Sequence, residues 1–263
     1  MVDSGIIVGN GSHNPRRLNG EKMNFRDSGY ALTYVGLAGV VFVAILSLEF
    51  APGLKPCTGG GCWGAPEAYR ILYLHVPFAW CSFLSFCVLF YGSLMWYLKR
   101  SEDAWVYFQS GSDLGVIFGL GVITSGPIWA SAEWGRPWDW GDMRLNSFAL
   151  LTAVALFLVY SRQSQPDTQQ NRDTLSAVGL FGFALVPITA GATTWWETTH
   201  PEVLIIESSE TVGMSPDVRL FLLISFGVMC ILFTGLLILS NKRYRLAAEV
   251  SGRKNEIDQE AIS

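Results

Sequence analysis

Two histidines are the residues of this chain best suited to binding a metal. His75 lies in "YRILYLHVPFAW" and His200 in "WWETTHPE", each beside the end of a long apolar run. Taken singly, each is explained equally well by a hydrogen bond to a carbonyl or a lipid headgroup. As a pair of neutral imidazoles they suit the two axial positions of a haem iron. Zinc needs three or four ligands, which the pair and a nearby acid, Glu197 or Glu202, only just supply.

A second group of residues that could bind a ligand lies in the segment "AEWGRPWDWGDMRL", residues 132–145. Gly135 and Pro137 break any helix and fix the loop that carries its indoles. A rigid shelf of indole rings suits a large flat ligand, because offset stacking adds about 0.5–1.5 kcal/mol per ring pair. The alternative is that tryptophans gather at the membrane interface as anchors. Anchoring alone explains four tryptophans elsewhere, Trp63, Trp80, Trp96 and Trp105.

Three arginines accompany this aromatic segment, namely Arg70, Arg136 and Arg144. Each can form a charge-assisted pair with a carboxylate, including the propionate of a haem. The alternative is that they neutralise the acids of the same loop, Glu133, Asp139 and Asp142.

The elements that must position these residues are predicted to be membrane-spanning helices. The chain has 263 residues, is 50% hydrophobic and only 15% charged, and its mean hydropathy is +0.32. A bilayer-spanning helix needs about 20 mostly apolar residues. We therefore predict an all-α integral membrane protein with six transmembrane helices, the fourth starting within the tryptophan segment. The apolar stretches are residues 31–50, 71–98, 114–132, 145–160, 175–193 and 220–240.

The distribution of lysine and arginine predicts the orientation of these six helices. With six crossings both termini share a side, and that side collects 13 of the 18 lysines and arginines. The positive-inside rule makes it cytoplasmic, so loops 51–70, 133–144 and 194–219 face outward from the inner membrane. We expect a cytoplasmic N-terminal arm (1–30), a membrane domain (31–240) with its tryptophan-rich loop at 133–145, and a solvated, disordered tail (241–263). Residues 1–30 lack the apolar centre of a cleavable signal.

Three motifs, "YRILYLHVP", "WGRPWDWGDMRL" and "WWETTHP", follow one another in this order. Together they resemble the tryptophan-rich, WWD-motif, haem-handling membrane proteins of cytochrome c maturation, and within these the CcmC family. The resemblance covers about residues 30–240. It implies six spans, with an outward tryptophan-rich loop between the third and fourth and one histidine on each side of that loop.

The resemblance also implies roles and partners. His75 and His200 would be the axial ligands of haem b. The protein would be a carrier and not an enzyme: it would hold haem at the outer face and pass it to a membrane-anchored haem chaperone of the CcmE type. An ABC transporter pair of the CcmA/CcmB type and a small subunit of the CcmD type would be its partners. The loop residues contacting haem would be Trp134, Gly135, Trp138, Trp140, Asp142 and Arg144, with Arg70 and Arg136 nearby.

Two features depart from the family pattern. Gly141 separates Trp140 from Asp142, and Asp139 adds a carboxylate, so either aspartate could take the role of the family's acid. Cys57 and Cys62, in "CTGGGC", lie outside the family core. A short disulfide is the use expected outside the cytoplasm. A c-type haem attachment site would need Cys-x-x-Cys-His.

Three other functions are compatible with parts of the pattern. A haem lyase component of the CcsA-like class would carry more spans and more histidines. An electron-transfer cytochrome b would place histidine pairs within its spans, often for two haems. A transporter would show internal repeats or broken helices at the midplane, and Gly126 with Pro127 is the only hint of such a break.

Overall fold

The computed structural model describes residues 15–51, 65, 67–195 and 216–260. Six helical segments of this part of the chain are long and apolar enough to cross a membrane, which confirms the predicted all-α, six-span fold. The fifth crossing is made by two helices in line. The elements are α1 (Pro15–Glu49), a short 3₁₀ turn (Ala68–Ile71), α2 (Leu72–Lys99), α3 (Glu102–Trp134), α4 (Met143–Ser164), α5 (Gln169–Phe183), α6 (Leu185–Trp195) and α7 (Pro216–Glu260).

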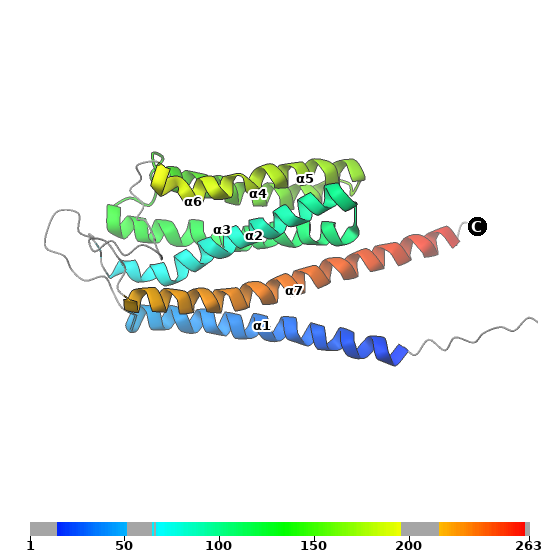
Figure 1. Cartoon of the computed structure of the whole chain (residues 1–263), viewed down its shortest axis with the longest axis horizontal. Helices are drawn as coiled ribbons and strands as arrows, with labels where there is room; N and C mark the ends of the chain where they lie inside the picture. The colour runs from blue at the N-terminus through cyan, green and yellow to red at the C-terminus, as the bar shows by residue number, and fades with distance from the viewer. Residues whose placement is uncertain (1–14, 52–64, 66, 196–215, 261–263) are drawn as a thin grey trace, which may run out of the picture.

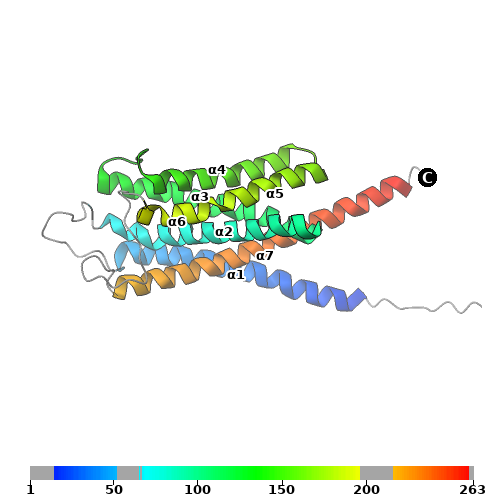
Figure 2. The ribbon, with the colours of Figure 1, turned by 45° about the horizontal axis from the view of Figure 1, so that its top comes forward.

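The helices form three layers (Figure 1). The antiparallel pair α2 and α3 lies in the middle, α1 and α7 pack against each other on one side, and α4, α5 and α6 cover the other side. Both α1 and α7 extend past the central helices, as the turned view of Figure 2 also shows. We call the end where α1 begins and α7 finishes the termini end. The opposite end, where residues 135–142 join α3 to α4, is the loop end.

Small residues bring the two central helices close together. A side chain on Gly92 of α2 would collide with the backbone of Phe108, and one on Gly111 of α3 with the backbone of Leu89. Close backbone approach through small residues is typical of helix pairs in membranes, where lipid is as apolar as the helix surface. The two helices therefore form the rigid centre from which the functional side chains project.

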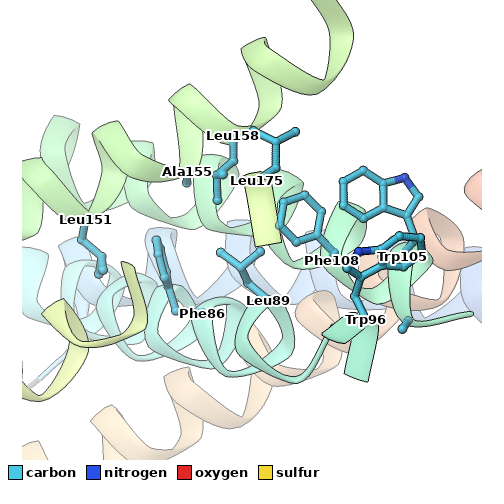
Figure 3. Packing of buried hydrophobic residues seen from close by; sticks show 10 residues of the cluster. Phe86, Leu89, Trp96, Trp105, Phe108, Leu151, Ala155, Leu158 and Leu175 are labelled. Atoms are coloured by element: carbon cyan, nitrogen blue, oxygen red, sulfur yellow. The ribbon is translucent and has the colours of Figure 1, made fainter. Parts of the chain in front are cut away.

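A buried apolar cluster joins this central pair to α4 and α5 (Figure 3). Phe86 and Leu89 of α2 and Phe108 of α3 are fully buried, together with Leu151 of α4. Large apolar side chains also cover the outer surface, including Phe42 of α1 and Phe157 of α4, which are 60% and 52% exposed. Apolar residues on both the inside and the outside are what a helix bundle in lipid requires.

Charged residues join three helices near the termini end. Arg162 of α4 forms an ion pair with Asp113 of α3. Tyr244 of α7 donates its hydroxyl proton to Asp113 Oδ2 over 2.6 Å and accepts a hydrogen bond of the same length from Arg162. The charges of the pair are thus balanced within the bundle, as a buried ion pair must be.

The prediction about the end of the last span was wrong. The tail was predicted to be disordered, but α7 continues to Glu260. Its residues 241–260 contain no proline and many good helix formers, and Arg245 pairs with Asp103 of α3 at 3.0 Å. Gly126 with Pro127, the only hint of a break in the sequence, does not interrupt α3, which runs through both residues. The break is instead at Ala184, between α5 and α6, because Pro187 cannot donate a helical hydrogen bond.

Trp96 and Trp105 do not act as interfacial anchors, contrary to the prediction. Both are 4% exposed and belong to the apolar cluster of α2 and α3. The indole N–H of Trp96 donates to Asp173 of α5 at 2.8 Å. Burial of both rings in the bundle makes them part of the core.

Candidate functional site

His75 lies in a pocket between α2, α3 and α4 at the loop end. It is the fourth residue of α2, directly after the 3₁₀ turn that begins this span. The pocket has a volume of about 60 Å³. Two residues of the tryptophan segment, Trp138 and Arg144, are part of its wall. The structure therefore brings His75 together with the aromatic loop. The other lining residues are Val76, Ala79, Trp80, Phe83, Val122, Ile123, Gly126, Pro127, Leu145 and Phe148.

The hydrogen bonds of Ser125 determine the tautomer of His75. Nδ1 of His75 lies 2.8 Å from the hydroxyl oxygen of Ser125. That hydroxyl donates its single proton to the carbonyl of Gly121 over 2.6 Å, so it accepts a proton from Nδ1. This network assigns the ring proton to Nδ1 and the lone pair to Nε2. A neutral imidazole with its lone pair on Nε2 is in the form that ligates iron.

Gly126 makes room for the same ring. A Cβ atom at this position would lie 3.1 Å from His75 Cε1, which is closer than a normal van der Waals contact. Ser125 and Gly126 are thus adjacent residues of α3 that seat the imidazole, one by a hydrogen bond and one by the absence of a side chain. Gly126 was predicted only as a hint of a helix break, and Ser125 was not among the predicted site residues. The serine–glycine pair in an apolar span was the available signal.

The tryptophan loop is held by the ends of the two helices that it joins. Gly135 ends α3 with a left-handed backbone, φ +69°, which glycine adopts without strain. Asp142 begins α4, and its carboxylate accepts hydrogen bonds from the backbone N–H groups of Arg144 and Leu145 at 2.9 and 3.1 Å. Asp142 is 2% exposed. It therefore acts as the N-cap of α4, a role that explains an aspartate at this position without a ligand.

Asn146 closes the loop from within the first turn of α4. Its amide N–H₂ group donates to the carbonyls of Trp140 and Asp142 at 2.8 and 2.7 Å, and its Oδ1 accepts from the indole of Trp138 at 3.3 Å. Asn146 was not among the predicted site residues. An amide side chain one turn after the N-cap was the signal, because asparagine commonly bonds nearby backbone.

The three tryptophans of the loop have different surroundings. Trp138 lines the His75 pocket, and Trp140, whose ring centroid is 5.9 Å from that of Trp138, is 84% exposed. Trp134 points elsewhere: its ring meets Trp129 edge-on at 4.9 Å and packs on the cluster that includes Leu222 of α7. Trp138 and Trp140 are therefore neighbours with an interplanar angle of 58°, while Trp134 packs in the bundle, and a ligand-stacking shelf made by the first two remains a prediction.

The three arginines also divide into separate groups. Arg144 lines the pocket with His75. Arg136 pairs with Asp139 of its own loop at 2.5 Å, as the neutralising alternative predicted. Arg70 pairs with Glu67 at 3.1 Å and donates to the carbonyl of Leu48 at the end of α1. Among the three, only Arg144 is placed to meet a ligand beside His75.

Several predicted site residues lie outside the described part of the chain. His200, the second histidine of the predicted haem site, is one, and the possible zinc ligands Glu197 and Glu202 and the cysteines Cys57 and Cys62 are others. Among the residues described, no group of three or more His, Cys, Asp or Glu side chains could hold a metal ion. The predicted pairing of His75 with His200 and the disulfide remain predictions.

A six-span membrane protein with a histidine pocket beneath an aromatic loop is the class that this fold and site define. Residues 29–257 match the CcmC family, described as heme exporter protein C. The chain belongs to this family.

Individual relatives agree with the family match. The chain is 29% identical over 189 residues to a ccmC-like mitochondrial protein of cytochrome c biosynthesis from Marchantia polymorpha, covering 68% of this chain and 80% of the relative. It is 28% identical over 176 residues to heme exporter protein C of Bradyrhizobium diazoefficiens, covering 65% of each. The protein of that name in Escherichia coli K12 is 27% identical over 216 residues, 75% of this chain and 86% of the relative.

Proposed function

We propose that this protein binds haem b at the loop end and transfers it to a membrane-anchored haem chaperone for cytochrome c maturation. His75 and His200 are the axial ligands in this proposal. The loop end faces outward from the inner membrane, and both termini are cytoplasmic. Membership of the heme exporter protein C family and the excess of lysine and arginine on the termini side support the proposal.

The observation that carries the proposal is the arrangement around His75. Its tautomer places the lone pair on Nε2. The same pocket contains an indole, Trp138, and a guanidinium, Arg144. An iron ligand, a flat aromatic face and a cation match the iron, the macrocycle and a propionate of haem.

The size of the pocket favours transfer over permanent storage. The volume of about 60 Å³ is enough for a few water molecules at most, so a haem ligated by His75 would extend beyond it. The largely exposed ring of Trp140 lies 5.9 Å from that of Trp138, which lines the pocket, and in the proposal it contacts the exposed part of the macrocycle. Haem held at an open edge can gain a ligand from a partner before it loses His75 or His200. A haem chaperone of the CcmE type is the proposed acceptor, with CcmA/CcmB-type and CcmD-type subunits in the same assembly.

The proposal assigns no bond-breaking step to this chain, which therefore acts as a carrier and not as an enzyme. A haem lyase would form thioether bonds between haem and apocytochrome. Incubation of the haem-loaded protein with apocytochrome alone separates the two roles. We expect no covalent haem on the apocytochrome, and thioether formation without other subunits would establish the lyase.

The visible absorption spectrum of the purified protein tests the ligand assignment. The wild-type protein and the variants His75→Gly and His200→Gly are compared in detergent, oxidised and reduced. His13→Gly is the matched control, because it removes the remaining histidine of the chain. We expect a low-spin haem spectrum in the wild type and the control, loss of it in both ligand variants, and recovery on adding imidazole.

Two results would contradict the proposal. A haem spectrum that is unchanged in both His75→Gly and His200→Gly would show that these histidines are not the axial ligands. Binding of haem with normal ligation but no passage to the chaperone would leave a haem site and reject the delivery role.

A further inference from the structure

The pocket around His75 is too small for the ligand proposed for it. Its volume is about 60 Å³, whereas pockets that enclose drug-sized molecules have volumes of about 300–1,000 Å³. A haem whose iron is bound to the imidazole of His75 must bring the inner part of a wide macrocycle up to that ring. The pocket must therefore widen before the imidazole can bind haem iron.

All residues that line the pocket, except Trp138, belong to helices. They lie in α2, α3 and α4, whereas Trp138 lies in the loop 135–142 that joins α3 to α4. Phe83 and Phe148 are the lining residues of α2 and α4 that lie furthest from the loop end, and their ring centroids are 5.4 Å apart. Helices packed in this way cannot separate without disturbing the bundle. The pocket can therefore widen most readily at Trp138.

The two indoles of the pocket wall are held to different degrees. Trp80 of α2 meets the ring of Phe226 of α7 edge-on at 4.8 Å, so it packs between two helices. Trp138 is half-buried, and the one N–H of its indole donates to Asn146 Oδ1 over 3.3 Å, beyond the usual range of about 2.7–3.2 Å. Its ring neighbour Trp140 is itself 84% exposed. Of the two indoles, that of Trp138 is the one that can turn without disturbing helix packing.

The backbone of the loop that carries Trp138 is fixed at both ends. Gly135 ends α3, and Asp142 caps α4. The amide N–H₂ group of Asn146 donates to the carbonyls of Trp140 and Asp142 at 2.8 and 2.7 Å. These two bonds do not involve Oδ1, so they persist when the indole leaves it. A change of side-chain rotamer at Trp138 can thus open the pocket while the loop and the helices stay in place.

We propose that Trp138 is a gate on the His75 pocket. While its indole is bonded to Asn146 the pocket is closed, which is the state that the structure describes. When the indole turns outward, the pocket gains the volume of the ring, and the edge of a haem can approach Nε2 of His75. The inference rests on the proposed function for its ligand, but both states of the gate exist without haem. Haem then selects the open state, as ligands do at other gated sites.

Carbethoxylation of His75 by diethyl pyrocarbonate tests the gate without haem. This reagent acylates an unprotonated imidazole nitrogen that it can reach, and peptide mass spectrometry quantifies the product at His75. The haem-free full-length protein is treated in detergent, with N-acetylhistidine added as the internal standard. A gate that is open in about 0.1–10% of molecules predicts that His75 reacts about 10–1,000-fold more slowly than the standard.

Two substitutions at Trp138 give the expected order of rates. Trp138→Ala removes the gate, and His75 should then react at least about tenfold faster than in the wild type. Trp138→Phe keeps a ring but loses the hydrogen bond, and the rate should rise by about two- to tenfold. Trp140→Ala is the matched control, because it removes an indole of the same loop that does not line the pocket, and His75 should react at the wild-type rate. The Tm of each variant checks that the fold persists.

Two results would overturn the gate. Equal reaction of His75 in the wild type and in Trp138→Ala would show that the indole does not limit access. Equal acceleration by Trp140→Ala and Trp138→Ala would show that the whole loop moves and not one side chain. The ligand assignment is decided separately by the absorption spectrum of His75→Gly. A haem spectrum that does not depend on His75 would reject the proposed function, whereas the order of carbethoxylation rates would still establish the gate.

Discussion

Trp138 and Trp140 at the loop end differ in their surroundings from the tryptophans at the termini end. At the termini end, Trp105 stacks on Phe108 with centroids 4.4 Å apart and an interplanar angle of 7°. The guanidinium of Arg172 lies 5.2 and 5.1 Å from the rings of Trp96 and Trp105. At the loop end, Trp138 borders a pocket and Trp140 is 84% exposed.

This difference separates tryptophans that stabilise the fold from those available to a ligand. The termini-end rings meet permanent partners on both α3 and α5, so their interaction energy contributes to folding. The ring of Trp140 meets its neighbour Trp138 while most of its surface stays open. Ring contacts at the loop end can therefore be made with a ligand and lost again when it leaves.

The largest effect should come from truncating a termini-end ring. Trp105→Ala should lower the free energy of unfolding by about 3–5 kcal/mol, because it leaves a cavity in a packed core. Trp140→Ala should change it by less than about 0.5 kcal/mol, as for an exposed site. Equilibrium unfolding in mixed micelles measures both. An equal loss of unfolding free energy in the two variants would contradict the distinction between a packed and an exposed tryptophan.

Ser125→Ala tests how firmly the loop end holds its proposed ligand. Loss of a group that orients a metal-binding histidine costs about 10–100-fold in affinity, so we expect haem affinity to fall by that factor. Ser125→Thr keeps a hydroxyl and should restore most of it. Haem titration followed by absorbance gives the affinity, and Tm checks that the fold persists. Unchanged affinity in the alanine variant would make the Ser125–His75 contact structural only.

Trp140→Ala should slow haem transfer without changing the haem spectrum. Stacking of one ring contributes about 0.5–1.5 kcal/mol. We therefore expect the transfer rate to fall by at most about tenfold. Single-turnover transfer to the purified chaperone gives the rate. Trp140→Phe is the matched control, since it keeps an aromatic face. If the alanine variant transfers haem at the wild-type rate, Trp140 belongs to an interfacial belt and the shelf is confined to Trp138.

The smallest effect separates the capping role of Asp142 from a role of its charge. Asp142→Ala should cost about 1 kcal/mol of stability through loss of the N-cap, whereas Asp142→Asn should cost little, because asparagine caps equally well. Thermal unfolding measures the difference. A haem-transfer defect in Asp142→Asn at wild-type stability would show that the loop needs the carboxylate itself.

Much of the architecture could be predicted from sequence because transmembrane helices are specified locally. The stretches 31–50 and 220–240 are apolar enough to cross a bilayer whatever their neighbours are. The positions at which the helices end depend more on residues that are distant in the sequence. The extension of α7 to Glu260 includes the pair between Arg245 and Asp103, which residues 241–263 alone do not reveal. The break at Ala184 was missed because apolarity does not register the backbone effect of Pro187, which lies about three turns into the predicted span 175–193.

The candidate site was predictable in its residues and less so in its contacts. His75, Trp138 and Arg144 were selected by type and position, and all three line one pocket. Trp134 was selected by the same criterion but packs against Trp129. The positions of Trp134 and Trp138 in the sequence do not show which of them lines the pocket, since both lie within a few residues of a helix end. Which face of the helix end each occupies depends on how Gly135 ends α3.

The sequence by itself determined that this chain is a multi-span helical membrane protein with one chemically distinctive loop, because hydropathy and residue type act over short stretches. Only the tertiary structure decided which polar groups act on one another. Ser125 reaches His75 across 50 positions of sequence, and Arg162 reaches Tyr244 across 82. Such pairs exist because helix packing brings distant turns into hydrogen-bond range, and that packing depends on small residues such as Gly92 and Gly111, whose partners lie on another helix.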